Sequence, residues 1–347
     1  MGGMKKLKWF RSFIVSAGLL LASPYAKADA TYLLPIDVRT GVYVDIQAQV
    51  LNNPAAPAGG RTVLIQHGLA HTGNTARPMA ERIFATPSVS AKVSKVVFLD
   101  MPGHGGSSLP AGVLYGELGL RDYATTLIES IAALQTLGVQ IDTLVSHSMG
   151  GTIVQLAQDR LVSQGTNLRN RFGIDRSVFL SPSLSADVPW VTADLLVGTL
   201  LAVPHLRSSA ELGTYVEVSP LVWNVLFNTN LVALPVPGTP SISTINSQGY
   251  IAIEPYQATA ELLGIPGTPR LPVAAGIFGD AYGTISRLVT NSQDKNVLPF
   301  EERANYRHLT GDNTDLRFMI INRLDASHDM YLTNPQAMID LGIFSDL

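Results

Sequence analysis

The stretch Ser146-His147-Ser148-Met149-Gly150-Gly151 is the most informative part of this chain. It follows an apolar run at residues 141–145 and precedes a helical pattern over residues 152–161. This order predicts a strand, a tight turn with Ser148 at its apex, and a helix. Such a turn presents a serine hydroxyl outward, and the helix N-terminus leaves backbone N–H groups free for a developing oxyanion. The pattern predicts Ser148 as a nucleophile, although a Ser/Gly turn that only caps a helix has the same composition.

Three further apolar runs end in residues that can carry chemistry. Residues 63–66 lead into His67-Gly68, and residues 95–99 lead into Asp100-Met101-Pro102-Gly103-His104-Gly105. Residues 316–321 lead through a short loop to His328, which Asn334-Pro335 then follow. With Ser148, these motifs stand in the order found in the α/β-hydrolase superfamily, which the chain resembles from about Thr40 to its C-terminus. The resemblance implies a mostly parallel central sheet with helices on both faces and catalytic residues on loops at the C-terminal ends of the strands.

The alternation of apolar runs and helical patterns predicts the same α/β class from the residues alone. The clearest helix is expected where Tyr123, Leu127, Ile131 and Leu134 recur at helical spacing, with Gly138 as its C-cap. Further buried strands are expected at residues 176–181 and 273–278. The alternation stops between about residues 185 and 267, a Pro-, Leu-, Val- and Trp-containing stretch. We therefore expect one hydrolase domain over residues 31–347, with a cap inserted at about 185–267.

The resemblance implies that His328 is the general base and that an aspartate in the preceding loop orients it. Asp294 fits the family's motif Gly-x-x-Asp-x-x-Val, with Asn291 in place of the glycine. A helical pattern follows at residues 300–308. Asp280 is the alternative, because it comes just after the strand expected at residues 273–278. Asp187, which follows the strand expected at residues 176–181, is a third candidate. We favour Asp294, and the choice between it and Asp280 stays open on the sequence.

The oxyanion hole is expected to combine the backbone N–H of Met149 with that of Leu69, which follows His67-Gly68. His67 and His71 stand four residues apart, a spacing that binds metals on a helix, but Gly68 and the preceding strand argue against a helix here. The chain contains no cysteine, which excludes disulfides, thiolate catalysis and Cys-based zinc sites. We expect no metal and no cofactor to take part in the reaction.

Residues 1–30 have the pattern of a signal peptide. Lys5, Lys6, Lys8 and Arg11 form a basic start, and residues 13–22 form an apolar core. This core is shorter than the ~20 residues needed to span a bilayer. Small residues predict cleavage after Ala28 or Ala30, with export to a periplasm or out of the cell. Cleavage after Ala30 removes five basic residues and one Asp from a chain whose net charge is already −3, and an acidic surface disfavours nucleic-acid binding.

The expected activity is that of an exported serine hydrolase acting on carboxylic esters through an acyl-enzyme. The predicted cap contains apolar runs around Trp190, Leu200 and Trp223, which suit a hydrophobic acyl or aryl group better than a sugar. The partner is thus expected to be a small hydrophobic ester. Lactone, amide or thioester hydrolysis uses the same residues and stays open, as does a non-catalytic binding protein on a hydrolase scaffold.

Overall fold

The computed structural model describes residues 27–56, 59–183, 236–252, 254–264, 271, 273–279, 282–294, 299–311, 318–321, 323 and 325–344. Its strands are β1 Lys27–Arg39, β2 Val42–Asn52, β3 Arg61–Gln66, β4 Val93–Leu99, β5 Thr143–His147, β6 Arg176–Leu180, β7 Ile285–Asn291 and β8 Phe318–Ile321. The helices of nine or more residues are α1 Arg77–Ala85, α3 Leu120–Thr136, α4 Met149–Ser163 and α10 Pro299–Thr310. The shorter helices are η1 Gly73–Ala76, α2 Pro87–Ser90, η2 Tyr115–Glu117, α5 Leu168–Phe172, α8 Ile242–Ser247, α9 Tyr256–Leu263, α11 Met330–Thr333 and α12 Pro335–Asp340.

The eight strands form one sheet in the order β1-β2-β4-β3-β5-β6-β7-β8. The pairs β1–β2 and β2–β4 are antiparallel, whereas every pair from β4 through β8 is parallel. Parallel strands end at the same edge of the sheet, so the loops after β3, β4, β5, β7 and β8 gather there. This confirms the predicted α/β fold with a mostly parallel sheet.

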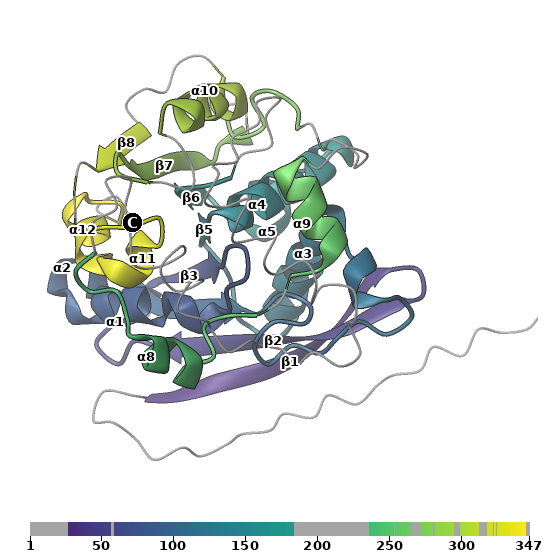
Figure 1. The fold of residues 1–347 in the computed structure, drawn as a ribbon, viewed down its shortest axis with the longest axis horizontal. Coiled ribbons are helices and arrows are strands. Elements are labelled where there is room, and N and C mark those ends of the chain that lie inside the picture. Colours follow the sequence, from purple (N-terminus) through teal and green to yellow (C-terminus); the bar gives the residue numbers. More distant parts are fainter. Residues whose placement is uncertain are drawn as a thin grey trace, which may run out of the picture.

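Helices cover both faces of the sheet (Figure 1). One apolar cluster joins α3, α4, α5 and α9 to the sheet, and the other joins α1, α11 and α12 to its opposite face. Within β5, Leu144 belongs to the first cluster and Val145 to the second, because successive side chains point to opposite faces. Burial on both faces is the reason why these strands are almost continuously apolar.

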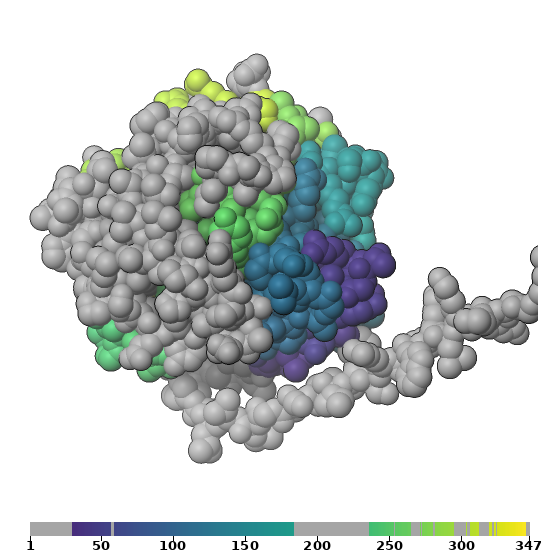
Figure 2. Space-filling view, turned by 45° about the vertical axis from the view of Figure 1, so that its right-hand side comes forward, coloured from purple at the N-terminus to yellow at the C-terminus, as the bar shows by residue number. Residues whose placement is uncertain are grey.

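The antiparallel pair β1–β2 forms one flank of the molecule. A blue segment that follows β4 lies against these purple strands (Figure 2), where Tyr43 and Ala111 form an isolated bridge. β1 begins at Lys27, so both expected cleavage positions lie within its first residues, while its pairing with β2 continues from Thr31 to Arg39. Export and cleavage stay predictions.

The helix predicted from Tyr123 to Leu134 is α3, with these side chains buried and Gly138 in a left-handed conformation just after it. The helix predicted at residues 152–161 is α4, which begins three residues earlier, directly after Ser148. Asn334 caps α12 as expected, since its side chain accepts a hydrogen bond from the Ala337 N–H at 3.1 Å.

The strand expected at residues 273–278 is wrong. Residues 273 and 274 belong to no strand, and residues 275–278 form a turn in which Gly276 has φ of +72°. The run is apolar because Ile277 and Phe278 pack into the core, where Phe278 lies edge-on to Phe179 at a ring separation of 5.1 Å. The next strand of the sheet is instead β7, and the loop that carries Asp294 follows it.

Residues 184–235, most of the predicted cap, lie outside the described residues. Of the remainder, α8 and the segment that ends at Glu254 lie near the loop after β3, and α9 packs against α3 and η2. The boundaries of the cap stay a prediction. None of the helices in the described part of the chain is long and apolar enough to cross a membrane.

Candidate active site

Ser148 stands at the sharp turn between β5 and α4. Its backbone angles are φ 49° and ψ −123°, in a region that a residue with a side chain rarely adopts. The turn is held by hydrogen bonds from the Ser148 N–H to the Leu180 carbonyl at 3.1 Å and from the Gly151 N–H to the Ser148 carbonyl at 2.8 Å. The residue keeps 9 % of its surface exposed. A strained residue fixed in this way matches the nucleophile turn that the sequence predicts.

Two glycines allow the neighbouring chain to approach this turn closely. A Cβ atom at Gly150 would lie 2.6 Å from the His67 carbonyl oxygen and 2.7 Å from that of Gln66. A Cβ atom at Gly68 would lie 2.9 Å from both the Ser148 Cβ and the His147 Nδ1. The loop after β3 therefore lies directly against Ser148, as the predicted oxyanion hole requires.

The structure brings His328 and Asp294 together. The His328 Nδ1 lies 2.8 Å from the Asp294 Oδ2, and both residues are buried. Because an ionised carboxylate only accepts hydrogen bonds, this contact fixes the proton on Nδ1 and leaves Nε2 as the basic nitrogen. Asp294 follows β7 and His328 follows β8, so the two strands place them at the same edge of the sheet.

His328 also lies beside the Ser148 turn. The His147 Nε2 lies 3.1 Å from the backbone carbonyl oxygen of His328, and the two imidazole rings are 4.7 Å apart. Since a carbonyl only accepts, His147 carries its proton on Nε2 and donates it to this bond. The residue before the predicted nucleophile thus holds the backbone of the predicted base.

The two predicted oxyanion residues follow Ser148 and Gly68 directly in the chain. Met149 is the first residue of α4 and is fully buried, and Leu69 follows Gly68 in the loop after β3. An N–H in the first turn of a helix has no partner within that helix, so α4 itself leaves the Met149 N–H available to an oxyanion. This arrangement suits acyl transfer, in which negative charge develops on a carbonyl oxygen.

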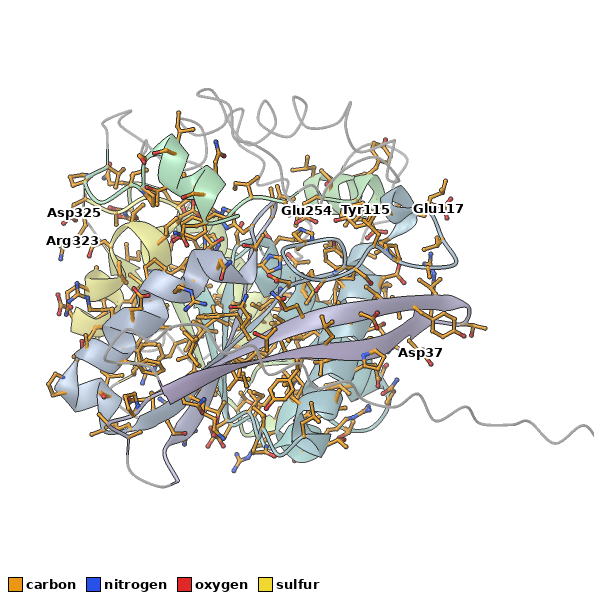
Figure 3. The ribbon with its side chains drawn as sticks, turned by 90° about the horizontal axis from the view of Figure 1, so that it is seen from below. Asp37, Tyr115, Glu117, Glu254, Arg323 and Asp325 are labelled. Carbon is orange, nitrogen blue, oxygen red and sulfur yellow. The ribbon has the colours of Figure 1, made fainter. Side chains whose placement is uncertain are left out.

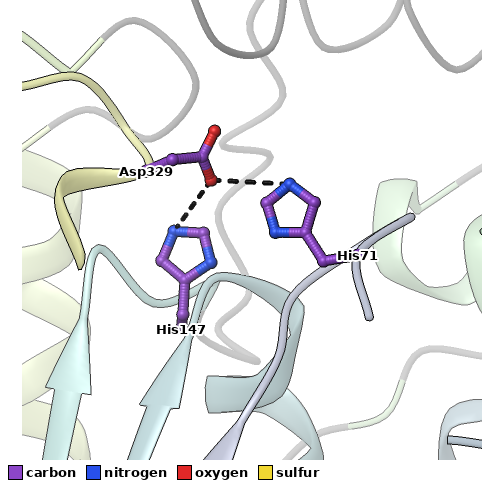
Figure 4. Close-up of side chains that lie close together, drawn as sticks. All are labelled: His71, His147 and Asp329. Atoms are coloured by element: carbon purple, nitrogen blue, oxygen red, sulfur yellow. Dashed lines mark ion pairs between the residues drawn. The ribbon is translucent and has the colours of Figure 1, made fainter. Parts of the chain in front are cut away.

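His71, His147 and Asp329 form a buried cluster behind the turn (Figure 4), with one potential ligand atom from each within 4.8 Å of the others. The Asp329 Oδ1 lies 3.6 Å from the His71 Nε2 and 3.5 Å from the His147 Nε2. These atoms could hold a metal ion only if His147 gave up its hydrogen bond to the His328 carbonyl. Burial, together with the neighbouring histidines, lowers the pKa of His71 and of His147 well below the ordinary value, so both are neutral. The expectation of a metal-free reaction stays a prediction.

His67 and His104 have structural contacts. The Met101 N–H donates to the His67 Nε2 at 3.1 Å, and the His67 Nδ1 in turn donates to the Gly68 carbonyl at 2.9 Å. His104 contacts the Pro102 carbonyl at 3.0 Å and the Glu254 carboxylate at 2.9 Å. His67 and His71 therefore have separate partners rather than a shared site.

Asp280 and Asp187 lie outside the described residues. Sequence reasoning missed Asp329, Tyr331 and Glu254. Asp329 stands next to His328 and Tyr331 reaches the His71 Nδ1 at 2.9 Å, so their closeness to His328 in the chain was a usable signal. For Glu254 the sequence carries no such signal, because its partner Ala70 lies 184 residues away.

The comparisons with known proteins agree with this fold. A search of curated proteins finds no match, but the model of the alpha/beta hydrolase family matches residues 62–341. Among solved structures, an esterase from Thermogutta terrifontis superposes with a TM-score of 0.54 at 15% identity, covering 86% of this chain and 92% of its own. A 2-hydroxy-6-oxo-6-phenylhexa-2,4-dienoate hydrolase from Rhodococcus gives a TM-score of 0.60 at 16% identity, covering 90% and 97%. A serine hydrolase from Cycloclasticus zankles gives 0.55 at 14% identity, covering 90% and 96%. The chain belongs to the alpha/beta hydrolase family.

Proposed function

We propose that this hydrolase cleaves carboxylic esters of hydrophobic substrates through a serine acyl-enzyme. The observation that carries the proposal is the pairing of His328 with Asp294 at 2.8 Å beside the strained turn of Ser148. A base oriented by a carboxylate, next to a serine at a helix N-terminus, is the arrangement that activates a serine hydroxyl.

The first half of the reaction forms the acyl-enzyme. The Ser148 oxygen attacks the ester carbonyl carbon while the His328 Nε2 takes the hydroxyl proton. The carbonyl oxygen becomes an oxyanion that the N–H groups of Leu69 and Met149 stabilise. The bond to the alcohol oxygen then breaks, and the imidazolium returns the proton to the departing alcohol.

The second half regenerates the enzyme. A water molecule gives its proton to the His328 Nε2 and attacks the acyl carbon, and the same two amides stabilise the second oxyanion. The bond to the Ser148 oxygen breaks, Ser148 recovers its proton from the imidazolium, and the carboxylic acid leaves. Asp294 holds the imidazole in the required tautomer in both halves.

The hydrophobic substrate class is supported by composition and by similar structures. Apolar runs around Trp190, Leu200 and Trp223 occupy the segment predicted as a cap. The solved structures of similar fold include the Thermogutta terrifontis esterase and the Rhodococcus phenyl-substituted dienoate hydrolase. An apolar lining with a few convergent polar groups favours acyl or aryl groups over sugars.

The test is hydrolysis of p-nitrophenyl esters graded from acetyl to dodecanoyl. We expect turnover with a preference for longer chains, and a loss of at least about 10⁴-fold in Ser148→Ala. Ser146→Ala is the matched control, because the buried Ser146 hydroxyl lies 3.4 Å from the Val178 carbonyl in the neighbouring strand β6. Loss of activity in Ser146→Ala, with activity kept in Ser148→Ala, would move the nucleophile to Ser146. No turnover of any ester would favour another acyl substrate or a binding role.

We also propose that residues 1–30 are an export signal. The basic start and apolar core support this, and the β1–β2 pairing from Thr31 onward does not depend on the residues removed. N-terminal sequencing of the protein recovered from a bacterial periplasm should begin at Asp29 or Thr31. An intact Met1 in that fraction would contradict the proposal.

A further inference from the structure

Glu254 is a buried carboxylate with three polar partners in the described part of the chain. It is 4 % exposed, and its Oε1 accepts hydrogen bonds from the Ala70 N–H at 2.8 Å and from the His104 Nε2 at 2.9 Å. Its Oε2 accepts one from the Tyr123 hydroxyl at 3.2 Å. Figure 3 shows Glu254 next to the labelled Tyr115, another buried residue.

The partner Ala70 belongs to the loop that forms one side of the proposed oxyanion hole. It follows Leu69 directly, and Gly68 before it lies against the Ser148 side chain. Ala70 has φ of +57°, the left-handed region that favours glycine. A residue in this region persists only where its surroundings hold it there.

The segment that ends in Glu254 supplies these surroundings. The Ala252 N–H donates to the Ala70 carbonyl at 2.8 Å, and the Thr72 N–H donates to the Tyr250 carbonyl at 3.0 Å. The Thr72 hydroxyl donates to the Gly249 carbonyl at 2.7 Å. The segment thus holds the loop by its backbone, and Glu254 adds a charged acceptor at the strained residue.

A buried carboxylate is costly unless it is paired, and His104 supplies the pair. Although burial opposes a charged imidazole, the Glu254 carboxylate raises the pKa of His104. Burial likewise opposes the charged carboxylate, but His104 holds the pKa of Glu254 below its ordinary value. His104 comes from the loop after β4, so the ion pair ties three separate parts of the chain together.

We propose that Glu254 is a positioning residue for the oxyanion hole, holding the Ala70 amide and thereby the orientation of the adjoining Leu69 peptide unit. This proposal rests on the proposed serine-hydrolase function. Glu254 touches no reacting atom. A charge-assisted hydrogen bond at the next amide keeps the Leu69 N–H preorganised, so the loop does not have to reorganise when charge develops on the substrate.

The test compares Glu254→Gln with Glu261→Gln. The Glu261 carboxylate, in α9, accepts the Leu120 N–H at 2.7 Å. It is a half-buried acceptor from the same part of the chain, but its partner lies at the start of α3 rather than in the loop after β3. We expect Glu254→Gln to lower kcat tenfold or more with KM nearly unchanged, and to weaken a trifluoromethyl ketone inhibitor by the same factor. Glu261→Gln should change kcat by less than twofold.

Ala70→Gly is the second variant in case Glu254→Gln fails to fold. It keeps the buried ion pair and relieves the left-handed strain, but it frees the backbone of the loop. We expect a lower kcat without a lower thermal midpoint. A kcat within twofold of the parent in either folded variant, or equal losses in Glu254→Gln and Glu261→Gln, would overturn the positioning role while the parent remained active. A parent enzyme without esterase activity would instead overturn the proposed function, and this inference with it.

Discussion

Asp294 and His328 are held together at 2.8 Å although 34 residues separate them in the chain. An Asp-to-Asn change at such a position keeps the shape but favours the wrong imidazole tautomer, so that Nε2 can no longer take the serine proton. We expect Asp294→Asn to lower kcat by up to about 10⁴-fold in a protein that stays folded.

Asp280→Asn is the control, because Asp280 is the rival acid on sequence grounds. Replacing an aspartate that only holds a loop should mainly lower the free energy of unfolding, typically by about 1 kcal/mol, and leave most of kcat. Steady-state kinetics, with the thermal midpoint of each variant, separate the two cases. Collapse of kcat in Asp280→Asn alone would show that the acid loop is assigned wrongly.

Among the elements, α4 depends on Gly150 for its approach to the end of β3. Alanine in a helix interior is normally favoured over glycine by about 1 kcal/mol. Here its Cβ would lie 2.6 Å from the His67 carbonyl oxygen, a backbone atom that cannot turn aside. Overpacking of this kind typically costs 1–3 kcal/mol, so we expect Gly150→Ala to destabilise the protein on balance by about 1 kcal/mol or more.

Urea unfolding measures this balance. Gly138→Ala is the comparison, because its Cβ would meet nothing within 4 Å and only the left-handed φ of +80° opposes it. We expect Gly138→Ala to lower the free energy of unfolding by about 1 kcal/mol. If Gly150→Ala proved more stable than the parent, the close approach of α4 to the loop after β3 would be wrong.

The elements also show where sequence patterns succeed and fail. The buried strands from β3 to β6 were predicted because they are apolar on both faces. β7 was missed because its buried residues include Ser286, Thr290 and Asn291, which break the apolar run. The apolar pattern instead predicts a strand at residues 273–278, but their apolar side chains cover the core without joining the sheet. A run of apolar residues indicates that a segment is buried. It does not indicate whether the backbone of that segment pairs with a neighbouring strand.

At the scale of the whole molecule, the residues of the site also divide into those that a sequence pattern predicts and those that it misses. Ser148, His328 and Asp294 could be predicted as site residues because each stands in a local motif of fixed spacing. Glu254 could not, since its contact with Ala70 depends on a fold that brings together residues 184 apart. The buried cluster of His71, His147 and Asp329 is likewise a product of the fold, because the loop after β3, the end of β5 and the loop after β8 meet at one edge of the sheet.

Buried neutral histidines should make the protein sensitive to acid. Burial, with the nearby His104, lowers the pKa of His67 to about 3, and those of His71 and His147 are also lowered. In the unfolded chain these groups protonate below about pH 6.5. The unfolded state then binds more protons, so stability falls as the pH drops below 6.5, by up to about 1.4 kcal/mol per pH unit for each histidine. His104 adds no slope there, because its pKa is raised and its contribution is complete below pH 6.5.

The measurement is the free energy of unfolding in urea between pH 7 and pH 5. His67→Gln should reduce the slope of this free energy against pH by up to about 1.4 kcal/mol per pH unit, the contribution of one proton. Stability that does not change over this range would contradict the neutral buried histidines.

The central claim is that Ser148 is an activated nucleophile, and covalent labelling tests it most directly. The parent protein is treated with a fluorophosphonate probe, and the modified peptide is identified by mass spectrometry. The account predicts one phosphonyl group on Ser148, labelling that slows strongly in Asp294→Asn, and none in Ser148→Ala. Absence of labelling in the folded parent, or a label on any other serine, would contradict it.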